Sequence, residues 1–213
     1  MNPSEGMVDV RERFRIPQDQ EQALLLRARR GDREAFAELL RPYQERIYGV
    51  ALRILGNRED ASEVAQEAFL RTFWKITGFR AEAHFYTWLY RIMLNLCRER
   101  LVRKKREAPR RVLPEQEDSS GDTSADLQVA DPAASPHEQA ARGERVALVR
   151  KALARLEEGD FQLLILREFD HLSYEELALF LGVPIGTVMS RLHRARLALV
   201  QELKKMGVSS YPE

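Results

Sequence analysis

Apolar residues in the first half of the chain recur at spacings of three and four, and no stretch alternates with a period of two. This periodicity predicts α-helices. The expected helices cover residues 20–29, 33–55, 59–77 and 85–105. Gly31-Asp32 and Gly56-Asn57 mark breaks, and Asp32 and Asn57 are expected to cap the helices that follow. We therefore expect an all-α fold.

Two further helices are predicted near the C-terminus, separated by a short turn. The first covers 174–181 and ends at Gly182, and the Val-Pro-Ile-Gly segment 183–186 holds two residues that do not prolong a helix. Thr187 is expected to cap the second helix. Its core-facing side chains fall within one narrow angular band, at Val188, Leu192, Ala195 and Leu199.

The outward side of that second helix carries Ser190, His193 and Arg194, with Met189 on the flank. Hydrogen-bonding groups and positive charge at the start of such a helix are typical of a helix-turn-helix, whose second helix enters the DNA major groove. The alternative is a pair of amphipathic helices in an ordinary bundle. The rest of the chain has to decide between them.

The charge is divided unevenly along the chain, although the net charge is only +1. Residues 19–106 carry 18 Lys/Arg against 12 Asp/Glu, residues 107–141 carry 2 against 8, and residues 142–207 carry 11 against 9. The acidic segment is rich in Pro, Ser, Asp and Ala and has few large apolar residues to offset its ordering entropy. We expect a flexible acidic linker between two small helical domains. The expected divisions are a flexible tail (1–18), a first domain (19–106), the linker (107–141), a helix-turn-helix domain (142–207) and a C-terminal tail (208–213).

Composition narrows the class of protein. The chain has 213 residues and a single cysteine, Cys97, which excludes an internal disulfide framework and favours a reducing, cytoplasmic location. Cys97 falls in an apolar sector and is expected to be a packed thiol. No stretch approaches the roughly 18 apolar residues of a membrane span. Because no metal-ligand spacing, phosphate loop or nucleophile motif stands out, we expect no metal, no cofactor and no enzyme.

One stripe interrupts the apolar surface of the predicted helix 85–105. Trp88, Arg91, Asn95 and Arg98 lie within about 80° of one another around the helix. Aromatic rings stack on unpaired bases, each worth roughly 1–3 kcal/mol, while arginines follow phosphates. The stripe therefore suits single-stranded nucleic acid, and the basic run 103–106 extends it. The alternative is that Trp88 is a core residue and the basic run is a solvated helix end.

Three segments together resemble bacterial extracytoplasmic-function (ECF) sigma factors. "REDASEVAQEAFLRTFWKI" resembles the family's core-polymerase-binding helix, and "GFRAEAHFYTWLYRIMLNLCRERLVRKKR" resembles its DNA-melting and −10-reading segment. "LILREFDHLSYEELALFLGVPIGTVMSRLHRAR" is similar to its helix-turn-helix, which reads the −35 element. The resemblance implies sigma region 2 in the first domain and sigma region 4 in the second. It also implies that the linker threads the RNA-exit path of the polymerase.

The resemblance also implies roles for individual residues. Phe79 and Asn95 match a pocket for a flipped −10 base, and Trp88 and Arg91 match the strand-separating helix. Arg98 of the stripe and Arg103 of the basic run are expected to continue this −10 and melting surface. The positions that match −35 contacts are Arg167, Tyr174, Glu175, Thr187, Ser190, His193 and Arg194. The positions that match the surface docking on the polymerase clamp are Glu63, Gln66 and Glu67.

Expected partners are core RNA polymerase, duplex DNA at −35, single-stranded DNA at −10, and an anti-sigma factor that masks both domains. Two positions depart from the family pattern: Met189 stands where many relatives have a basic residue, and Glu63 stands where aspartate is usual. Two other functions stay open. An autonomous helix-turn-helix regulator would bind duplex DNA alone, usually as a symmetric dimer. A sigma-mimicking decoy would bind an anti-sigma factor without touching DNA.

Overall fold

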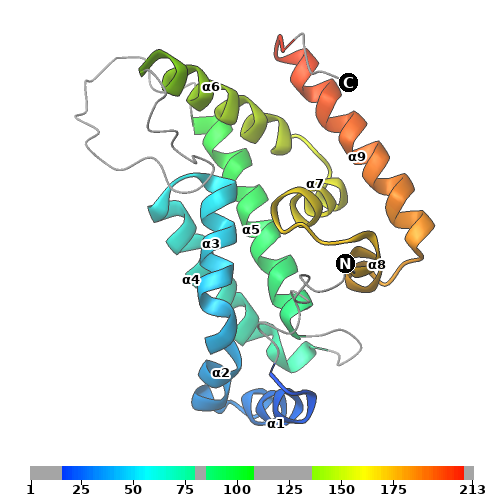
Figure 1. The fold of residues 1–213 in the computed structure, drawn as a ribbon. Helices are drawn as coiled ribbons and strands as arrows, with labels where there is room; N and C mark the ends of the chain where they lie inside the picture. The colour runs from blue at the N-terminus through cyan, green and yellow to red at the C-terminus, as the bar shows by residue number, and fades with distance from the viewer. Residues whose placement is uncertain (1–15, 80–84, 108–135, 209–213) are drawn as a thin grey trace, which may run out of the picture.

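The computed structural model describes residues 16–79, 85–107 and 136–208, and every regular element among them is helical (Figure 1). The N-terminal half contains α1 (Gln18–Arg29), α2 (Arg33–Leu40), α3 (Gln44–Leu55), α4 (Arg58–Lys75) and α5 (Phe85–Glu107), with short 3-10 segments at Arg41–Tyr43 and Ile76–Gly78. The C-terminal half contains α6 (Pro136–Leu153), α7 (Glu158–Leu164), the π-helical turn η5 (Ile165–Phe169), α8 (Tyr174–Leu181) and α9 (Ile185–Lys205). The predicted all-α fold is confirmed.

Both predicted caps in the N-terminal half are present. The Asp32 carboxylate accepts hydrogen bonds from the backbone N–H groups of Glu34 and Ala35, at 3.0 Å each, and starts α2. The Asn57 side chain accepts one from the Asp60 N–H at 2.8 Å and starts α4. The single helix predicted over 33–55 is wrong, because Pro42 has no N–H to donate and the chain tightens into a 3-10 turn there.

Of the two predictions for the turn between α8 and α9, the end of α8 at Gly182 is confirmed and the cap of α9 at Thr187 is wrong. Gly182 ends α8 in the left-handed conformation, with φ of 67°. Thr187 does not cap α9, because that helix already begins at Ile185 after Pro184. The Thr187 N–H donates to the Pro184 carbonyl at 2.9 Å, so Thr187 is inside the first turn. Proline fixes its own φ near the helical value and so favours a helix start at this point.

The outer parts of the predicted linker and tails belong to helices or to the core. Glu107 closes α5, and α6 begins at Pro136, so residues 136–141 are helical. Proline is well accommodated in a first helical turn, and the Glu, Gln and Ala residues that follow are strong helix formers. Ile16 is buried and α1 begins at Gln18, inside the predicted tail. The remaining linker, 108–135, and the ends 1–15 and 209–213 lie outside the described residues.

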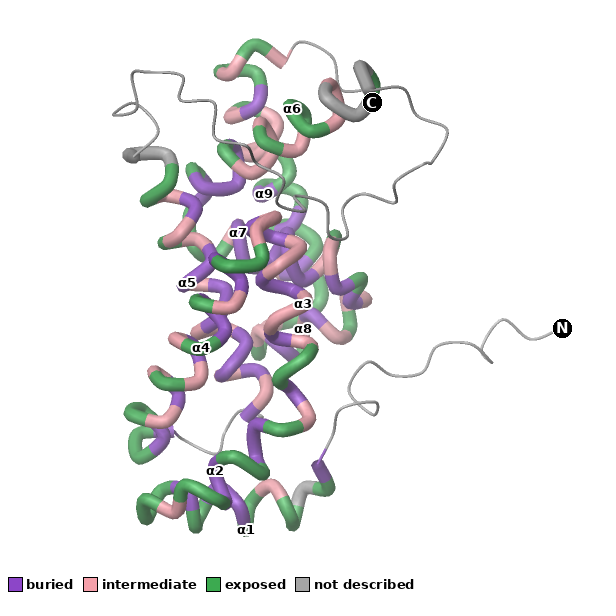
Figure 2. The backbone as a smooth tube through the Cα atoms, turned by 90° about the vertical axis from the view of Figure 1, so that its left-hand side faces the viewer, coloured by how far each residue is buried: buried purple, intermediate pink, exposed green. Residues whose placement is uncertain are grey.

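The two halves of the chain are packed against each other. Helix α5 lies between the N-terminal helices and α7 (Figure 1), and buried residues run through helices of both halves (Figure 2). One continuous apolar cluster includes Ile47 of α3, Leu94 of α5 and Phe161 of α7. This arrangement follows from α5, which is apolar around most of its circumference and has two sides to bury. The two helical halves therefore share one hydrophobic core.

Candidate nucleic-acid interface

The polar stripe of α5 faces the C-terminal half of the molecule. The Asn95 carbonyl oxygen accepts a hydrogen bond from the Gln162 amide of α7 at 2.7 Å. Arg91 donates to the Phe180 carbonyl at 2.9 Å, and its guanidinium lies over the Phe180 ring, 5.5 Å from the centroid. Arg98 donates twice to the Leu156 carbonyl, at 2.9 and 2.6 Å. The stripe therefore exists as predicted, but its polar members have partners within the chain.

Aromatic side chains occupy the start of the same stripe. The rings of Phe79 and Trp88 are 4.9 Å apart between centroids, and Phe85 lies 6.1 Å from both. Phe79 and Phe85 are buried, whereas Trp88 is half-buried against the core. In this conformation the Trp88 ring therefore packs against the buried Phe79 ring.

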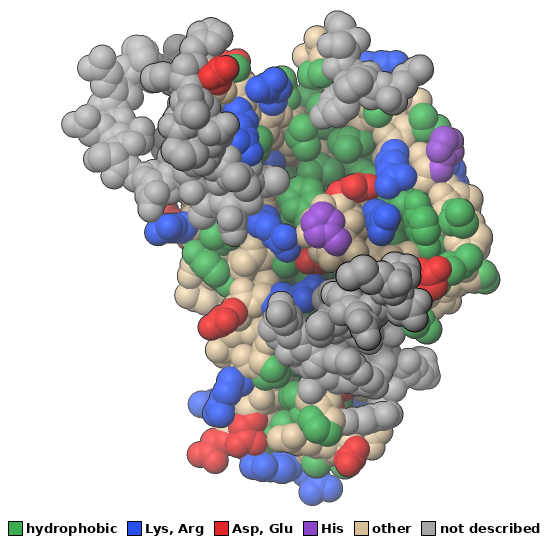
Figure 3. All heavy atoms as spheres, viewed as in Figure 1, with side chains coloured by type: hydrophobic (Ala, Val, Ile, Leu, Met, Phe, Trp, Pro, Cys, Tyr) green, Lys and Arg blue, Asp and Glu red, His purple; other side chains and the backbone are tan. Residues whose placement is uncertain are grey.

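Helix α9 separates a core face from a polar face, as predicted. Val188, Leu192 and Ala195 are buried and Leu199 is half-buried. The opposite face exposes Ser190, His193 and Arg194, with Thr187 half-buried at its edge and Met189 52% exposed. In the view of Figure 3 the visible His side chains lie over the C-terminal half, whereas Lys and Arg side chains are spread over the whole face.

Other predicted −35 residues lie on or just before α8. Glu175 is exposed in the first turn of α8. Arg167 donates to the Leu172 carbonyl at 2.6 Å, and its guanidinium lies 5.0 Å from the Tyr174 ring centroid. These contacts hold Arg167 against Tyr174 at the start of α8.

Arg191, an exposed cation on α9, was not predicted as a site residue from the sequence. It lies one helical turn after Thr187 and one turn before Arg194, so it belongs to the same outward face. This spacing of four residues from Thr187 and three from Arg194 could have identified Arg191 from the sequence. Arg196 is also exposed, but it pairs with Glu168 at 2.7 Å.

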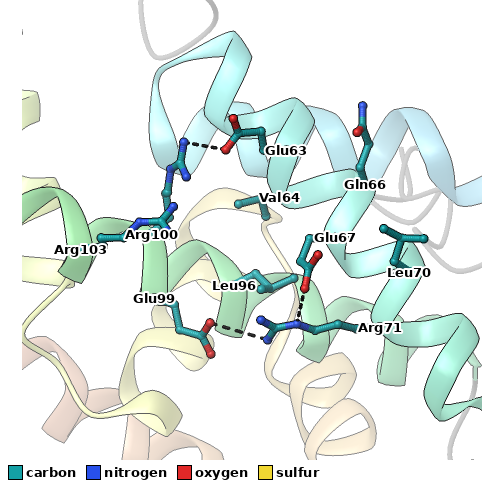
Figure 4. A pocket seen from close by; sticks show the side chains of 10 residues that line it. All are labelled: Glu63, Val64, Gln66, Glu67, Leu70, Arg71, Leu96, Glu99, Arg100 and Arg103. Carbon is teal, nitrogen blue, oxygen red and sulfur yellow. Dashed lines mark hydrogen bonds and ion pairs between the residues drawn. The ribbon is translucent and has the colours of Figure 1, made fainter.

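A groove with a volume of about 630 Å³ separates α4 from α5 and holds all three residues predicted to bind polymerase (Figure 4). Glu63 pairs with Arg100 at 2.7 Å, and Glu67 pairs with Arg71 at 2.8 Å. Gln66 is exposed and donates to the Ser62 hydroxyl at 3.3 Å. The two carboxylates are therefore already paired with cations of the same chain.

Arg103 was predicted to continue the −10 and melting surface through the basic run 103–106, and this assignment stays a prediction. Arg103 lines the groove between α4 and α5, next to Arg100 (Figure 4). Around the helix Arg103 lies roughly 140° from Arg98 but only about 60° from Trp88. The groove is also lined by Arg71, Glu99 and Arg100, which were not predicted as site residues.

Two large apolar side chains on α4 are exposed and were not identified from the sequence. Leu70 is 47% exposed and Trp74 is 67% exposed. They follow Glu63 and Gln66 at helical spacing and share their face of α4. An exposed tryptophan beside a groove is typical of a protein–protein contact. The three-and-four spacing of these apolar residues was visible, but it equally suited a core face.

An ion pair network ties α4 to α5 beneath this groove. Asp60 is buried and interacts with Arg100, at 2.7 Å from the Nε atom, and with Lys104. Burial acts to raise the pKa of Asp60, but the hydrogen bonds and charges of Lys104 and Arg100 outweigh burial and lower that pKa. The carboxylate therefore stays ionised and fixes the relative position of the two helices.

A second buried carboxylate, Asp170, lies where the two halves meet. It is 3.2 Å from Arg53 and 3.7 Å from Arg46, both on α3. Burial raises the pKa of Asp170 to about 6, although Arg46 and Arg53 act in the opposite direction. The packed structure therefore binds a proton on Asp170 more readily than the unfolded chain does.

This raised pKa predicts a pH effect on stability with a definite sign. The stabilisation from protonated Asp170 is complete below about pH 4 and is lost as the pH rises through about 6. Between pH 7.5 and pH 5 we expect wild type to gain about 1 kcal/mol relative to Asp170→Asn. Urea unfolding of both proteins at the two pH values measures this difference. A difference that is independent of pH would contradict the prediction.

The described residues contain no group of three or more His, Cys, Asp and Glu that could hold a metal ion. In the same part of the chain, no helix is both long and apolar enough to cross a membrane. Cys97 is buried, its thiol donates to the Met93 sulfur at 3.5 Å, and burial raises its pKa. The thiol is therefore packed, as predicted, and poorly reactive.

Comparison with known proteins identifies both halves of the chain. The model of sigma-70 region 2 matches residues 39–107, and the model of sigma-70 region 4 matches residues 147–199. The RNA polymerase sigma-H factor of Pseudomonas aeruginosa is 37% identical over 90% of this chain and 97% of its own length. The ECF RNA polymerase sigma-E factor of Haemophilus influenzae is 34% identical over 83% of this chain and 91% of its own. The chain belongs to the ECF sigma factor family.

Two solved structures are also similar to this sigma factor. CnrH, in a complex with the cytosolic domain of CnrY, is 24% identical, with a TM-score of 0.49 over 88% of this chain and 99% of that one. The sigma factor RpoE of Bartonella quintana, in a complex with the anti-sigma factor NepR, is 22% identical, with a TM-score of 0.44 over 83% and 99% of the respective chains.

The family match places each surface in a sigma region. Region 2 contains the α5 stripe and the groove between α4 and α5, and region 4 contains α8 and the polar face of α9. The sigma factor therefore holds region 4 against the stripe of region 2, while the polar face of α9 and the outer face of α4 stay exposed.

Proposed function

We propose a division of roles within this alternative sigma factor. Region 2 docks on core RNA polymerase through α4 and reads and melts the −10 element through α5. Region 4 reads the −35 element through α9. The observation that carries the proposal is the presence of separate polar surfaces on matched regions 2 and 4, namely the α5 stripe and the exposed face of α9.

The −35 contacts are assigned to the outward face of α9 and the start of α8. Ser190, His193 and Arg194 are exposed where a recognition helix enters the major groove. Arginine reads guanine edges or phosphates, and hydroxyl and imidazole groups address base edges. Arg191 is added to this set as a further cation on the same face.

The −10 contacts are assigned to Trp88, Arg91, Asn95 and Arg98, together with Phe79. Extrusion of a base from the duplex costs a few kcal/mol, which stacking on an aromatic ring and hydrogen bonds to the base edge offset. The amide of Asn95 supplies such hydrogen bonds, and the arginines follow the strand.

The polymerase contact is assigned to the outer face of α4, with Glu63, Gln66, Glu67, Leu70 and Trp74. The resemblance to the family's clamp-binding helix supports the three polar residues, and exposure supports the two apolar ones. An anti-sigma factor is proposed as a second protein partner, as the resemblance implies. The proposed location is the cytoplasm, where polymerase and promoter DNA are found, and the sigma factor itself is assigned no catalytic step.

Run-off transcription tests the function as a whole. Core polymerase is assayed with and without the sigma factor on a library of promoter sequences, and we expect transcripts from a defined subset only when the sigma factor is present. Tight, sequence-specific binding to duplex DNA without polymerase would favour an autonomous regulator instead. Binding to an anti-sigma factor with no promoter-dependent transcript would favour a decoy.

Replacing Arg194 with Ala should weaken recognition of the −35 element. If Arg194 contacts a base, the expected cost is about 1–3 kcal/mol, or roughly 5- to 150-fold in promoter affinity. Core-polymerase affinity should stay constant, because Arg194 is distant in sequence from α4 and lies on the other region. The measurement is binding of the reconstituted holoenzyme to promoter fragments with intact and scrambled −35 elements.

Lys204→Ala is the matched control, because it removes the same charge from the exposed far end of α9. It should leave promoter affinity nearly unchanged. Equal behaviour of the two variants would mean that the start of α9 does not read the −35 element.

A further inference from the structure

Helix α9 exposes an apolar edge beside the polar face assigned to the −35 element. Met189 is 52% exposed in the second turn of α9, and Ile185 is exposed one turn earlier. At about 100° per residue, Met189 lies roughly 70° to one side of the midpoint between Ser190 and His193. Arg194 lies roughly 70° to the other side. The outward face of α9 therefore has a cationic edge and an apolar edge.

Both edges fit within the width of a DNA groove. A helix with its side chains is about 10–12 Å across and the major groove is about 12 Å wide, so the sides of an inserted helix stay close to the base pairs. The Cα–Cβ bonds of a helix tilt toward its N-terminus. The Met189 side chain is therefore directed toward the end of α9 that enters the groove.

The chemistry of Met189 limits what this side chain can recognise in the groove. A thioether carries no charge, donates no hydrogen bond and accepts one only weakly, so it distinguishes polar base edges poorly and gains little from a phosphate. The apolar group that the bases present in the major groove is the C5 methyl of thymine. Contact between the thioether and this methyl removes apolar surface of both groups from water, which is favourable.

We propose that Met189 reads the C5 methyl of a thymine in the −35 element and so determines part of the promoter specificity. This inference rests on the assignment of α9 to the −35 element under the proposed function. A thymine methyl also fixes the orientation of the base pair, because reversing an A·T pair moves the methyl across the groove. Promoters selected by this sigma factor should therefore share one A·T pair of fixed orientation in the −35 element.

The probe is a promoter fragment found by run-off transcription, in which single thymines of the −35 element are replaced with deoxyuridine on either strand. This replacement removes the C5 methyl and leaves the base pairing unchanged. Affinity is measured for holoenzyme reconstituted from core polymerase and the full chain. At one position we expect the affinity of wild type to fall about fourfold, as for the loss of one buried methyl group.

Variants at Met189 show whether this residue is the partner of the methyl. Met189→Ala should bind the thymine fragment more weakly and lose its response to deoxyuridine at that position. Met189→Leu keeps an apolar side chain of similar volume and should restore the response. Leu197→Ala is the matched control, because Leu197 is an exposed apolar residue about two turns further along α9. It should respond to deoxyuridine as wild type does.

The absence of a response at every −35 thymine would overturn the proposal, as would a response that Met189→Ala retains. An equal loss of affinity for all fragments in Met189→Ala would also overturn it, because that result indicates a contact with protein or with phosphates. A scrambled −35 element tells the two failures apart. If wild type binds intact and scrambled elements equally, the assigned role of α9 has failed. If wild type distinguishes them without a methyl-dependent response, only the reading by Met189 has failed.

Discussion

Replacing Leu70 and Trp74 together with aspartate should abolish sigma-dependent transcription and leave the fold intact. Both side chains are exposed on α4, at 47% and 67%, so neither substitution opens a cavity in the core. A buried tryptophan at the centre of a protein interface contributes on the order of 2–4 kcal/mol, and a carboxylate in its place adds a desolvation cost. Core-polymerase affinity should fall by at least about 100-fold.

The measurement is titration of labelled sigma factor with core polymerase, followed by thermal unfolding of the variant alone. A matched control replaces Leu26 and Leu197, which are 56% and 49% exposed on α1 and α9, with aspartate. This control adds the same charge without touching α4, and its core affinity should equal that of wild type. If the α4 variant kept wild-type affinity, the polymerase would have to dock elsewhere.

Replacing Asn95 with Ala should reduce open-complex formation about tenfold or more and relax discrimination at one base of the −10 element. The reason is the loss of hydrogen bonds between the amide and the edge of an extruded base. The same substitution removes the 2.7 Å bond to Gln162, which should cost about 1 kcal/mol in stability. Permanganate footprinting of promoters with single −10 substitutions and thermal unfolding measure the two effects.

Gln162→Ala separates the two roles of Asn95. It removes the same hydrogen bond between the regions, but Gln162 lies on α7 and is not assigned to DNA. We expect a similar loss of stability and unchanged base discrimination. If Asn95→Ala and Gln162→Ala had the same footprints on every promoter, the role of Asn95 would be confined to packing.

Much of the local structure could be predicted because it depends on neighbouring residues. Asp32 and Asn57 cap helices within three residues of themselves, and Gly182 ends α8 through its own backbone conformation. The errors in the predicted helix bounds arose at prolines, where the backbone geometry of one residue outweighed the spacing of apolar residues. Pro42 broke a helix whose apolar pattern continued across it, and Pro184 started α9 before the polar residue that looked like its cap.

The functional surfaces were predictable to different extents. The outward face of α9 is set by the repeat of its own core residues, so Ser190 and Arg194 could be assigned from spacing. The exposure of Trp74 could not be predicted, because an apolar residue at helical spacing is usually buried. Only the packing of α4 shows that the Trp74 side chain is exposed.

The sequence by itself determined the helices, the helix-turn-helix and the presence of a polar stripe on α5, because each depends on the order of residues within one segment. Only the tertiary structure decided what the stripe contacts. Asn95 and Gln162 are separated by 67 positions, and Arg53 and Asp170 by 117. A stripe of Trp, Arg and Asn suits solvent, nucleic acid or another domain equally well, since all three satisfy its hydrogen bonds. Which of them is present depends on how region 4 packs against an α5 helix that is apolar on more than one side.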